Sequence, residues 1–182
     1  MAVFRKILIA NRGEIAIRVM RAANEMGKST VAVFAKEDKL SLHRFKADEA
    51  YEIGEALGPV ASYLNINEII SVAIRAGADA IHPGYGLLSE KPEFAKACNK
   101  AGITFIGPTA EIMEKLGNKA NARKIAEKAG VPVIPASDIL PDNPKDLIKI
   151  AKKLGFPLML KASWGGGGRG MRLINNIEDV EK

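Results

Sequence analysis

The sequence predicts an α/β protein in which a doubly wound parallel sheet is followed by the beginning of a second domain. Two observations predict the sheet. Short apolar runs, suited to strands buried on both faces, alternate with segments whose apolar residues recur at helical spacing. The connections are short, which favours parallel strands joined by crossover helices. A third observation, a run of glycines between two short apolar segments near residue 165, predicts a hairpin outside that sheet.

Strands and helices are expected to alternate through residues 1–116. The expected strands are the apolar runs 6–10, 30–35, 79–82 and 103–106. The expected helices follow residues 11–14 and cover 67–76 and 90–101. In the first helix the apolar stripe is Ile15, Val19, Ala22 and Met26. Gly27 and Gly102 follow helices, as C′ residues do.

From Thr109 the pattern turns helical, and the turn near residues 107–118 is the expected boundary between a domain at 1–116 and a second domain at 117–182. Thr109, Asn118 and Asn143 can each cap a helix, with Gly130 and Gly155 ending the later two. A strand is expected at 131–134 and a further helix after Asn176. We expect this second domain to be incomplete.

The segment 156–172 (FPLMLKASWGGGGRGMR) reads as strand, loop and strand, with Lys161 at the end of the first strand. Gly165, Gly166, Gly167 and Gly168 have no Cβ atoms, so their N–H groups can approach an anion closely. Arg169 and Arg172 add positive charge, and the combination suits a polyphosphate. No helix follows, as a dinucleotide fingerprint requires, and no Gly-Lys-Ser/Thr follows either. The alternative is a flexible hairpin with a surface lysine.

Other candidate residues have ordinary structural alternatives. Tyr85 and Gly86 lie in HPGYG, after a predicted strand, where ligands of doubly wound sheets collect, although Tyr85 could simply pack. His82 is expected to be a hydrogen-bonded structural histidine. Lys119, in a first helical turn, could be a surface lysine. Cys98 lies four residues after Phe94, which predicts a packed thiol.

Arg18, Arg21 and Glu25 form a second stripe on the first helix, which periodicity alone would place in solvent. The composition, 47% hydrophobic and 26% charged, is that of a globular protein, and no apolar run could span a membrane. A single cysteine fits a reducing, cytoplasmic compartment.

The net charge of +6 is uneven, with 15 Lys/Arg against 14 Asp/Glu in residues 1–116 and 12 against 7 in residues 117–182. Nucleic acid is a weak alternative explanation of that excess, since no recognition motif or interleaved aromatic residues accompany the glycines.

Five blocks together carry a resemblance to a known family. In order, they are KILIANRGEIAIRVMRA, HRFKADEAY, DAIHPGYGLLSE, FIGPTAEIMEKLGNK and LMLKASWGGGGRGMR. They resemble the start of the biotin carboxylase module of biotin-dependent carboxylases, which are ATP-grasp enzymes. HRFKADEAY and the Ser-Trp before the glycines are most similar to the pyruvate carboxylases, with acetyl-CoA and acyl-CoA carboxylases as alternatives. The resemblance implies a Rossmann-like pre-ATP-grasp domain followed by a truncated ATP-grasp domain.

The resemblance also implies a ligase activity. Bicarbonate attacks the γ-phosphate of ATP, carboxyphosphate forms, and CO₂ passes to biotin on a biotinyl domain, with pyruvate converted to oxaloacetate for gluconeogenesis as the final step. Mg²⁺ or Mn²⁺ is the implied metal. Positions matching ATP ligands are Lys119, Lys161 and Gly165 to Gly168; Tyr85 and Gly86 match the border of the biotin site, and Arg21 and Glu25 match a dimer contact.

The catalytic and metal-binding residues of the family match no position in these 182 residues. We therefore expect the chain to be part of a longer homo-oligomeric enzyme and to be inactive alone. Two other classes remain: a different ATP-grasp enzyme such as a carbamoyl phosphate synthase, and a non-catalytic nucleotide-binding domain. Only the ANRGEIA and HPGYG blocks separate the first of these from a biotin carboxylase.

Overall fold

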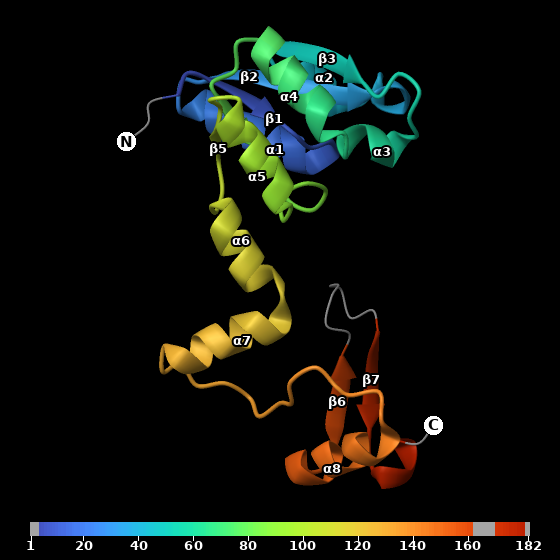
Figure 1. Ribbon diagram of the computed structural model, residues 1–182. Coiled ribbons are helices and arrows are strands. Elements are labelled where there is room, and N and C mark those ends of the chain that lie inside the picture. The colour runs from blue at the N-terminus through green and yellow to red at the C-terminus, as the bar shows by residue number, and fades with distance from the viewer. Residues whose placement is uncertain (1–3, 162–169, 181–182) are drawn as a thin grey trace. The chain divides into compact units, whose positions relative to one another are not determined.

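The computed structural model describes residues 4–161 and 170–180 of the chain (Figure 1). The chain separates into two compact units, residues 1–113 and residues 114–182, and each is considered by itself. The division into domains at residues 116 and 117 stays a prediction.

The first unit is built on a five-stranded sheet in the order β3-β2-β1-β4-β5, in which every neighbouring pair is parallel. The strands are β1 (Lys6–Ile9), β2 (Ser29–Ala35), β3 (Glu49–Ile53), β4 (Ala80–His82) and β5 (Thr104–Phe105). The order runs outward in both directions from β1 and β4, as in a doubly wound fold. The predicted fold class is confirmed.

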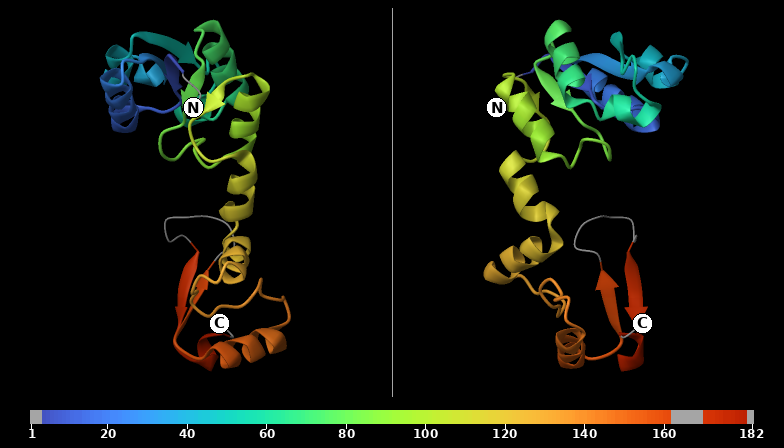
Figure 2. Two further views of the ribbon diagram at one scale, coloured as in Figure 1. Left: turned by 90° about the vertical axis from the view of Figure 1, so that its left-hand side faces the viewer. Right: turned by 45° about the vertical axis from the view of Figure 1, so that its right-hand side comes forward.

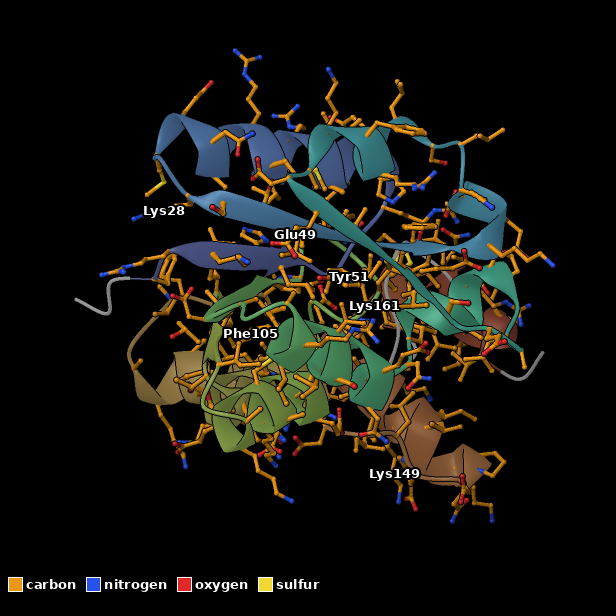
Figure 3. All side chains as sticks on the ribbon, turned by 90° about the horizontal axis from the view of Figure 1, so that it is seen from above. Lys28, Glu49, Tyr51, Phe105, Lys149 and Lys161 are labelled. Carbon is orange, nitrogen blue, oxygen red and sulfur yellow. The ribbon has the colours of Figure 1, made fainter. Side chains whose placement is uncertain are left out.

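Helices cover both faces of this sheet (Figure 3). Those of the first unit are α1 (Gly13–Glu25), α2 (Leu42–Lys46), α3 (Pro59–Tyr63), α4 (Ile66–Arg75) and α5 (Pro92–Lys100), with a 3₁₀ turn, η1, at Lys36–Asp38. Helix α1 packs on one face, over Ile7 and Ile9, and α4 and α5 pack on the other, over Leu8. Because the side chains of β1 alternate between two covered faces, nearly the whole strand is buried.

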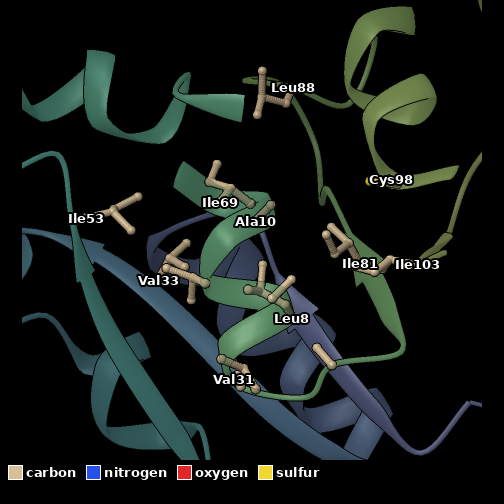
Figure 4. Close-up of a cluster of buried hydrophobic side chains, with 14 of the residues drawn as sticks. Leu8, Ala10, Val31, Val33, Ile53, Ile69, Ile81, Leu88, Cys98 and Ile103 are labelled. Atoms are coloured by element: carbon tan, nitrogen blue, oxygen red, sulfur yellow. The ribbon is translucent and has the colours of Figure 1, made fainter. Parts of the chain in front are cut away.

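The larger apolar cluster lies on the α4 and α5 face (Figure 4). Leu8, Val31 and Val33 of the sheet meet Ile69 of α4 there. Cys98 of α5 belongs to the same cluster and has no exposed surface, so the predicted packed thiol is confirmed. Burial raises the pKa of this thiol to about 12, which keeps it protonated and unreactive.

The buried face of α1 differs from the predicted stripe. Ala16, Met20 and Ala23 face the sheet, whereas Ala22 is exposed and Met26 is 66% exposed. Two alanines on the inner face let the helix approach the strands closely. Met26 lies beyond the last helical residue, and Gly27, with φ +67°, ends the helix as predicted.

Residues 36–63 hold elements that the apolar patterns did not predict, namely η1, α2, β3 and α3. Strand β3 lies at the edge of the sheet and only Ile53 in it is fully buried, so EAYEI has no continuous apolar run. Edge strands need less apolar surface than central ones, and this explains why it was missed.

The elements from residue 110 onward are α6 (Ala110–Gly117), α7 (Lys119–Lys128), α8 (Pro144–Leu154), β6 (Leu158–Lys161), β7 (Met171–Ile174) and the 3₁₀ turn η2 (Ile177–Asp179). Strands β6 and β7 form the predicted antiparallel hairpin, and α8 lies beside it (Figure 2). The predicted caps are confirmed for three helices. Thr109 Oγ1 accepts from Ile112 N, Asn118 from Ala120 N and Asn143 from Lys145 N.

The strand predicted at 131–134 is wrong, because no strand is assigned there and Ile134 is 86% exposed. Pro132 and Pro135 lack the N–H groups that a ladder needs. The chain is held instead through side chains of α7, since Arg123 Nη1 donates to Ala136 O over 3.1 Å and Lys124 pairs with Asp138. The element after Asn176 is a single 3₁₀ turn, capped by that asparagine as predicted.

Candidate functional site

The carboxyl ends of β1 and β4 lie side by side where the strand order reverses. Ala10 N donates to His82 O over 2.9 Å and extends the pairing to the last residue of β4. The segment after β1 begins α1, and the segment after β4 forms a loop at residues 83–91. In doubly wound sheets ligands bind at this edge, because the segments that follow the two strands diverge there and leave a crevice.

The side chain of Asn11 connects these two segments. Its side chain is buried, and Nδ2 donates to Pro83 O over 2.8 Å and to Tyr85 O over 2.9 Å. Its Oδ1 accepts from Arg12 N over 2.9 Å. The side chain passes so close to Gly84 that a Cβ there would lie 2.6 Å from Nδ2. Asn11 was not among the residues predicted to belong to the site.

Tyr85 and Gly86 lie in the loop that follows β4, at the carboxyl end of that strand, as predicted. Tyr85 is 79% exposed, so it does not pack in the core of the first unit. Gly86 adopts φ +70°, and nothing lies within 4 Å of the position a Cβ would take. His82 Nδ1 accepts from Gly84 N over 2.9 Å, so the predicted structural role of His82 is confirmed. Burial lowers the pKa of His82 and favours its neutral form.

A second polar cluster lies beside α1, and sequence reasoning missed it. Arg12 Nη2 pairs with Asp38 Oδ1 over 2.8 Å, and the guanidinium lies 5.5 Å from the centre of the Tyr63 ring. Tyr63 donates to Asp38 Oδ2 over 2.8 Å and accepts from Ala35 N. Although burial opposes ionisation of Asp38, the hydrogen bonds from Tyr63 and Ser41 and the charge of Arg12 lower its pKa. The cluster fixes the start of α1 to η1 and α3.

The predicted phosphate-binding hairpin is partly described. Lys161 ends β6 and pairs with Met171, while Arg172 pairs with Leu160. Because neighbouring pairs alternate, Lys161 and Arg172 point to opposite faces of the hairpin. Gly165 to Gly168 and Arg169 lie outside the described residues.

The remaining predicted site residues lie on helices. Lys119 is the first residue of α7 and is exposed. Arg21 Nε pairs with Glu25 Oε1 over 3.0 Å on the exposed face of α1, and Arg18 pairs with Glu14 there over 3.3 Å. The structure brings Arg21 and Glu25 together as one pair, and it holds Tyr85 and Gly86 in one loop. The roles of these residues stay predictions.

The described residues contain neither a cluster of metal-ligating side chains nor a membrane-spanning helix. In residues 4–161 and 170–180, no group of three or more His, Cys, Asp or Glu side chains could hold a metal ion. Within the same residues, no helix is long and apolar enough to cross a bilayer.

Family models match both parts of the chain. The model described as the biotin carboxylase N-terminal domain matches residues 3–113, and the model described as the ATP-binding domain of the carbamoyl-phosphate synthase L chain matches residues 118–182. The first match spans the five-stranded parallel sheet, and the second spans the β6–β7 pair. The chain belongs to the biotin carboxylase family.

Similar proteins of known name cover almost all of this chain. Pyruvate carboxylase 1 of Caenorhabditis elegans is 51% identical over 179 residues, which are 98% of this chain and 15% of the relative. The biotin carboxylase of Halalkalibacterium halodurans is 52% identical over 180 residues, 98% of this chain and 39% of the relative. The chain therefore spans a small part of the length of the curated relatives that it matches.

Solved structures agree with the sequence matches. A Rhizobium etli pyruvate carboxylase variant, determined with acetyl coenzyme A as allosteric activator, is 60% identical with a TM-score of 0.88, covering 98% of this chain and 16% of that one. The biotin carboxylase domain dimer of a Hydrogenobacter thermophilus 2-oxoglutarate carboxylase, in complex with MgADP, ADP and bicarbonate, is 46% identical with a TM-score of 0.92, covering 100% of this chain and 40% of that one.

Proposed function

We propose that these residues form the N-terminal part of the biotin carboxylase module of a pyruvate carboxylase, which uses ATP and bicarbonate to carboxylate biotin before the carboxyl group passes to pyruvate. The observation that carries the proposal is the succession of the two family matches, a biotin carboxylase N-terminal domain at 3–113 and an ATP-binding domain at 118–182. Pyruvate is proposed as acceptor because pyruvate carboxylases at about 51% identity cover nearly the whole chain.

On the ATP side, the residues of this chain supply positive charge and close backbone contact. Phosphoryl transfer depends mainly on positioning and on neutralising developing charge. Lys161 lies four residues before Gly165, the first glycine of the run, and we propose that it binds a phosphate oxygen. Gly165 to Gly168 are proposed to close over the phosphates, and Lys119 to provide a second cation. Mg²⁺ would neutralise phosphate charge when bound, and we assign it no ligand among the described residues.

On the biotin side, we propose that Tyr85 and Gly86 border the ring of biotin carried by a biotinyl domain. The support is their position at the switch point of the sheet, together with the exposure of Tyr85 and the open space beside Gly86. Arg21 and Glu25 are proposed to contact the second subunit of a homodimer. A cytoplasmic location is part of the proposal, although the mouse relative is named as mitochondrial.

One alternative has an observation in its favour. The second family match is described by a carbamoyl-phosphate synthase, an enzyme of the same ATP-binding class. The first match, at 3–113, favours biotin carboxylase instead, and it spans the longer part of the chain. Acetyl-CoA and acyl-CoA carboxylases would use the same module with a different final acceptor.

The test of the ATP site is Lys161→Ala in the full-length enzyme that carries this chain. One charge-assisted hydrogen bond contributes about 1.5–3 kcal/mol, so the KM for ATP in bicarbonate-dependent ATP hydrolysis should rise roughly ten- to hundredfold. Lys149→Ala is the matched control, because Lys149 is an exposed lysine of the same unit, paired with Asp146. Equal, small effects of both substitutions would reject Lys161 as a ligand. A wild-type enzyme whose ATP hydrolysis ignored bicarbonate and biotin would reject the proposed function.

A further inference from the structure

The loop after β4 has an unusual backbone. Gly84 and Gly86 adopt φ +66° and φ +70°, and Leu87, which is not a glycine, adopts φ +46°. Left-handed backbone is unfavourable for a leucine, because its Cβ crowds the following carbonyl oxygen. Such strain persists only where surrounding contacts determine the conformation. The contacts that hold this loop are therefore informative.

At its far end, the loop is held by its own backbone and by the core. Ser89 N donates to Gly86 O over 2.9 Å, and Leu88 is buried at 2% exposure. At its near end, the loop is held through the carbonyl groups of Pro83 and Tyr85, the two residues that flank Gly84 in the chain. Both accept from the single atom Asn11 Nδ2.

Asparagine fits this position better than other side chains. Its amide nitrogen carries two donors for the two carbonyls, and its oxygen accepts from Arg12 N, so every hydrogen-bonding group is used. Aspartate of the same shape has no donor, and serine has one. The tight approach of Asn11 to Gly84 also leaves no room for a Cβ there. Asn11 and Gly84 together fix the position of the Tyr85 backbone relative to the end of β1.

We infer that Asn11 is a positioning residue. It holds Tyr85 and Gly86 in the conformation in which they contact the ring of biotin. This inference rests on the proposed function, because it assigns the loop to biotin. Asn11 is buried beneath the loop at 3% exposure, so it acts through the loop and not by touching biotin. Its loss should affect the biotin step and spare ATP binding.

The test uses Asn11→Asp and Asn11→Ser in the full-length enzyme, with free biotin as substrate. Misplacing a positioned group by about 1 Å can cost up to about a hundredfold in rate, so kcat/KM for biotin should fall at least about tenfold. The KM for ATP and the biotin-independent ATP hydrolysis should change less than about twofold. Asn11→Ser, which introduces no charge, keeps the test valid if Asn11→Asp does not fold.

Val31→Ala is the control for general destabilisation. Val31 is fully buried in the first unit, and it lies in the half of β2 away from the loop. If Asn11 variants lose activity toward biotin and ATP together, in proportion to their loss of melting temperature as Val31→Ala does, the positioning role is rejected. Unchanged kcat/KM for biotin also rejects it.

Hydrogen exchange separates this inference from the proposed function. In Asn11→Ser, amides of residues 84–88 should exchange faster while those of β1 and α4 keep their protection. If the wild-type enzyme shows no response to biotin, the proposed function fails. Faster exchange confined to the loop would even then support the positioning role of Asn11. Unchanged exchange in the loop would reject that role, whatever the response of the enzyme to biotin.

Discussion

The two units of the chain bury very different amounts of apolar surface. In the first, helices on both faces enclose a parallel sheet, and residues such as Leu8 and Ile81 have no exposed surface. Among the residues of the second unit that the structure describes, only Ala151 and Ile174 are buried apolar side chains. The hairpin there exposes Met159 by 46% and Leu173 by 52%.

The difference teaches how each unit holds its site. The loop carrying Tyr85 rests on a complete core, so a single buried amide can fix its backbone against strain. The hairpin carrying Lys161 has one helix beside it and few buried side chains. Stability in the second unit therefore comes mainly from helix caps and local pairing, which are individually weak. The first unit should tolerate local strain better and core damage worse.

The largest expected effect is on the free energy of unfolding, and a matched pair of leucine substitutions, one in each unit, measures it. Leu8→Ala empties part of the larger apolar cluster and should lower the free energy of unfolding by about 2–5 kcal/mol. Leu173→Ala, at a half-exposed position of β7, should cost less than about 1 kcal/mol, since little apolar area is lost. Urea unfolding followed by circular dichroism measures both. Similar losses for the two variants would mean that the hairpin carries a core of its own.

The next effect concerns two glycines that share a left-handed backbone but differ in surroundings. Gly130→Ala, at φ +72° with open space around it, should cost only the strain of that conformation, about 1–2 kcal/mol. Gly84→Ala adds contact with Asn11 and Ile15 Cγ2 and should cost distinctly more. Thermal unfolding compares them. Equal losses would show that the loop moves away from Asn11 easily, contrary to the fit described above.

Much of the fold of both units could be predicted because it depends on local patterns. Apolar runs indicated β1, β2 and β4, and Asn118, Asn143 and Gly27 marked helix ends through side-chain or backbone properties of single residues. Strand β3 was missed because an edge strand needs little apolar surface. The strand at 131–134 was wrongly predicted because its apolar residues suit a strand, whereas Pro132 and the following Pro135 have no N–H to donate to a strand ladder.

The site was less predictable because it depends on contacts between distant segments. HPGYG could be assigned to the carboxyl end of a strand from its position alone. The role of Asn11 arises only when β1 and β4 become neighbours, which brings it to residues 83–85. Arg12, Asp38 and Tyr63 meet for the same reason. An asparagine directly after a central buried strand is the only signal in the sequence that could have indicated the positioning role of Asn11.

A smaller effect is expected from pH, and it too should distinguish the units. The two histidines, His43 and His82, both lie in the first unit. His43 has no exposed surface; its Nε2 lies 3.2 Å from Val33 O, and its Nδ1 has no partner among the described residues. Burial lowers the pKa of His43, opposed by Val33 O and the nearby Asp38, and assisted by Arg12.

The sign follows from proton binding. Below about pH 6.5 the unfolded chain protonates its histidines while the folded unit resists, so stability is complete above that pH and falls as the pH drops through it. The lowered pKa of Asp38 acts only below its ordinary value near 3.8. The melting temperature of the first unit should decrease between pH 7.5 and 5.5. His43→Gln, which keeps a donor for Val33 O, should show a shallower decrease. An identical slope would assign the effect elsewhere.

The smallest effect on stability is expected from the ion pairs on α1, and it offers the sharpest test of the dimer contact. Arg21 with Glu25 and Arg18 with Glu14 are both exposed pairs at i and i+4. Each should stabilise the helix by only about 0.3–0.5 kcal/mol, so Arg21→Ala and Arg18→Ala should leave the melting temperature nearly unchanged.

Assembly should separate these two variants where stability does not. If Arg21 contacts a second subunit, its guanidinium loses water there and its removal leaves a partner group unpaired, which costs far more than an exposed pair. Sedimentation of the full-length enzyme should therefore show dimer dissociation at higher concentrations for Arg21→Ala than for Arg18→Ala. Indistinguishable dissociation would return the Arg21 stripe to its simpler interpretation, a face of α1 exposed to solvent.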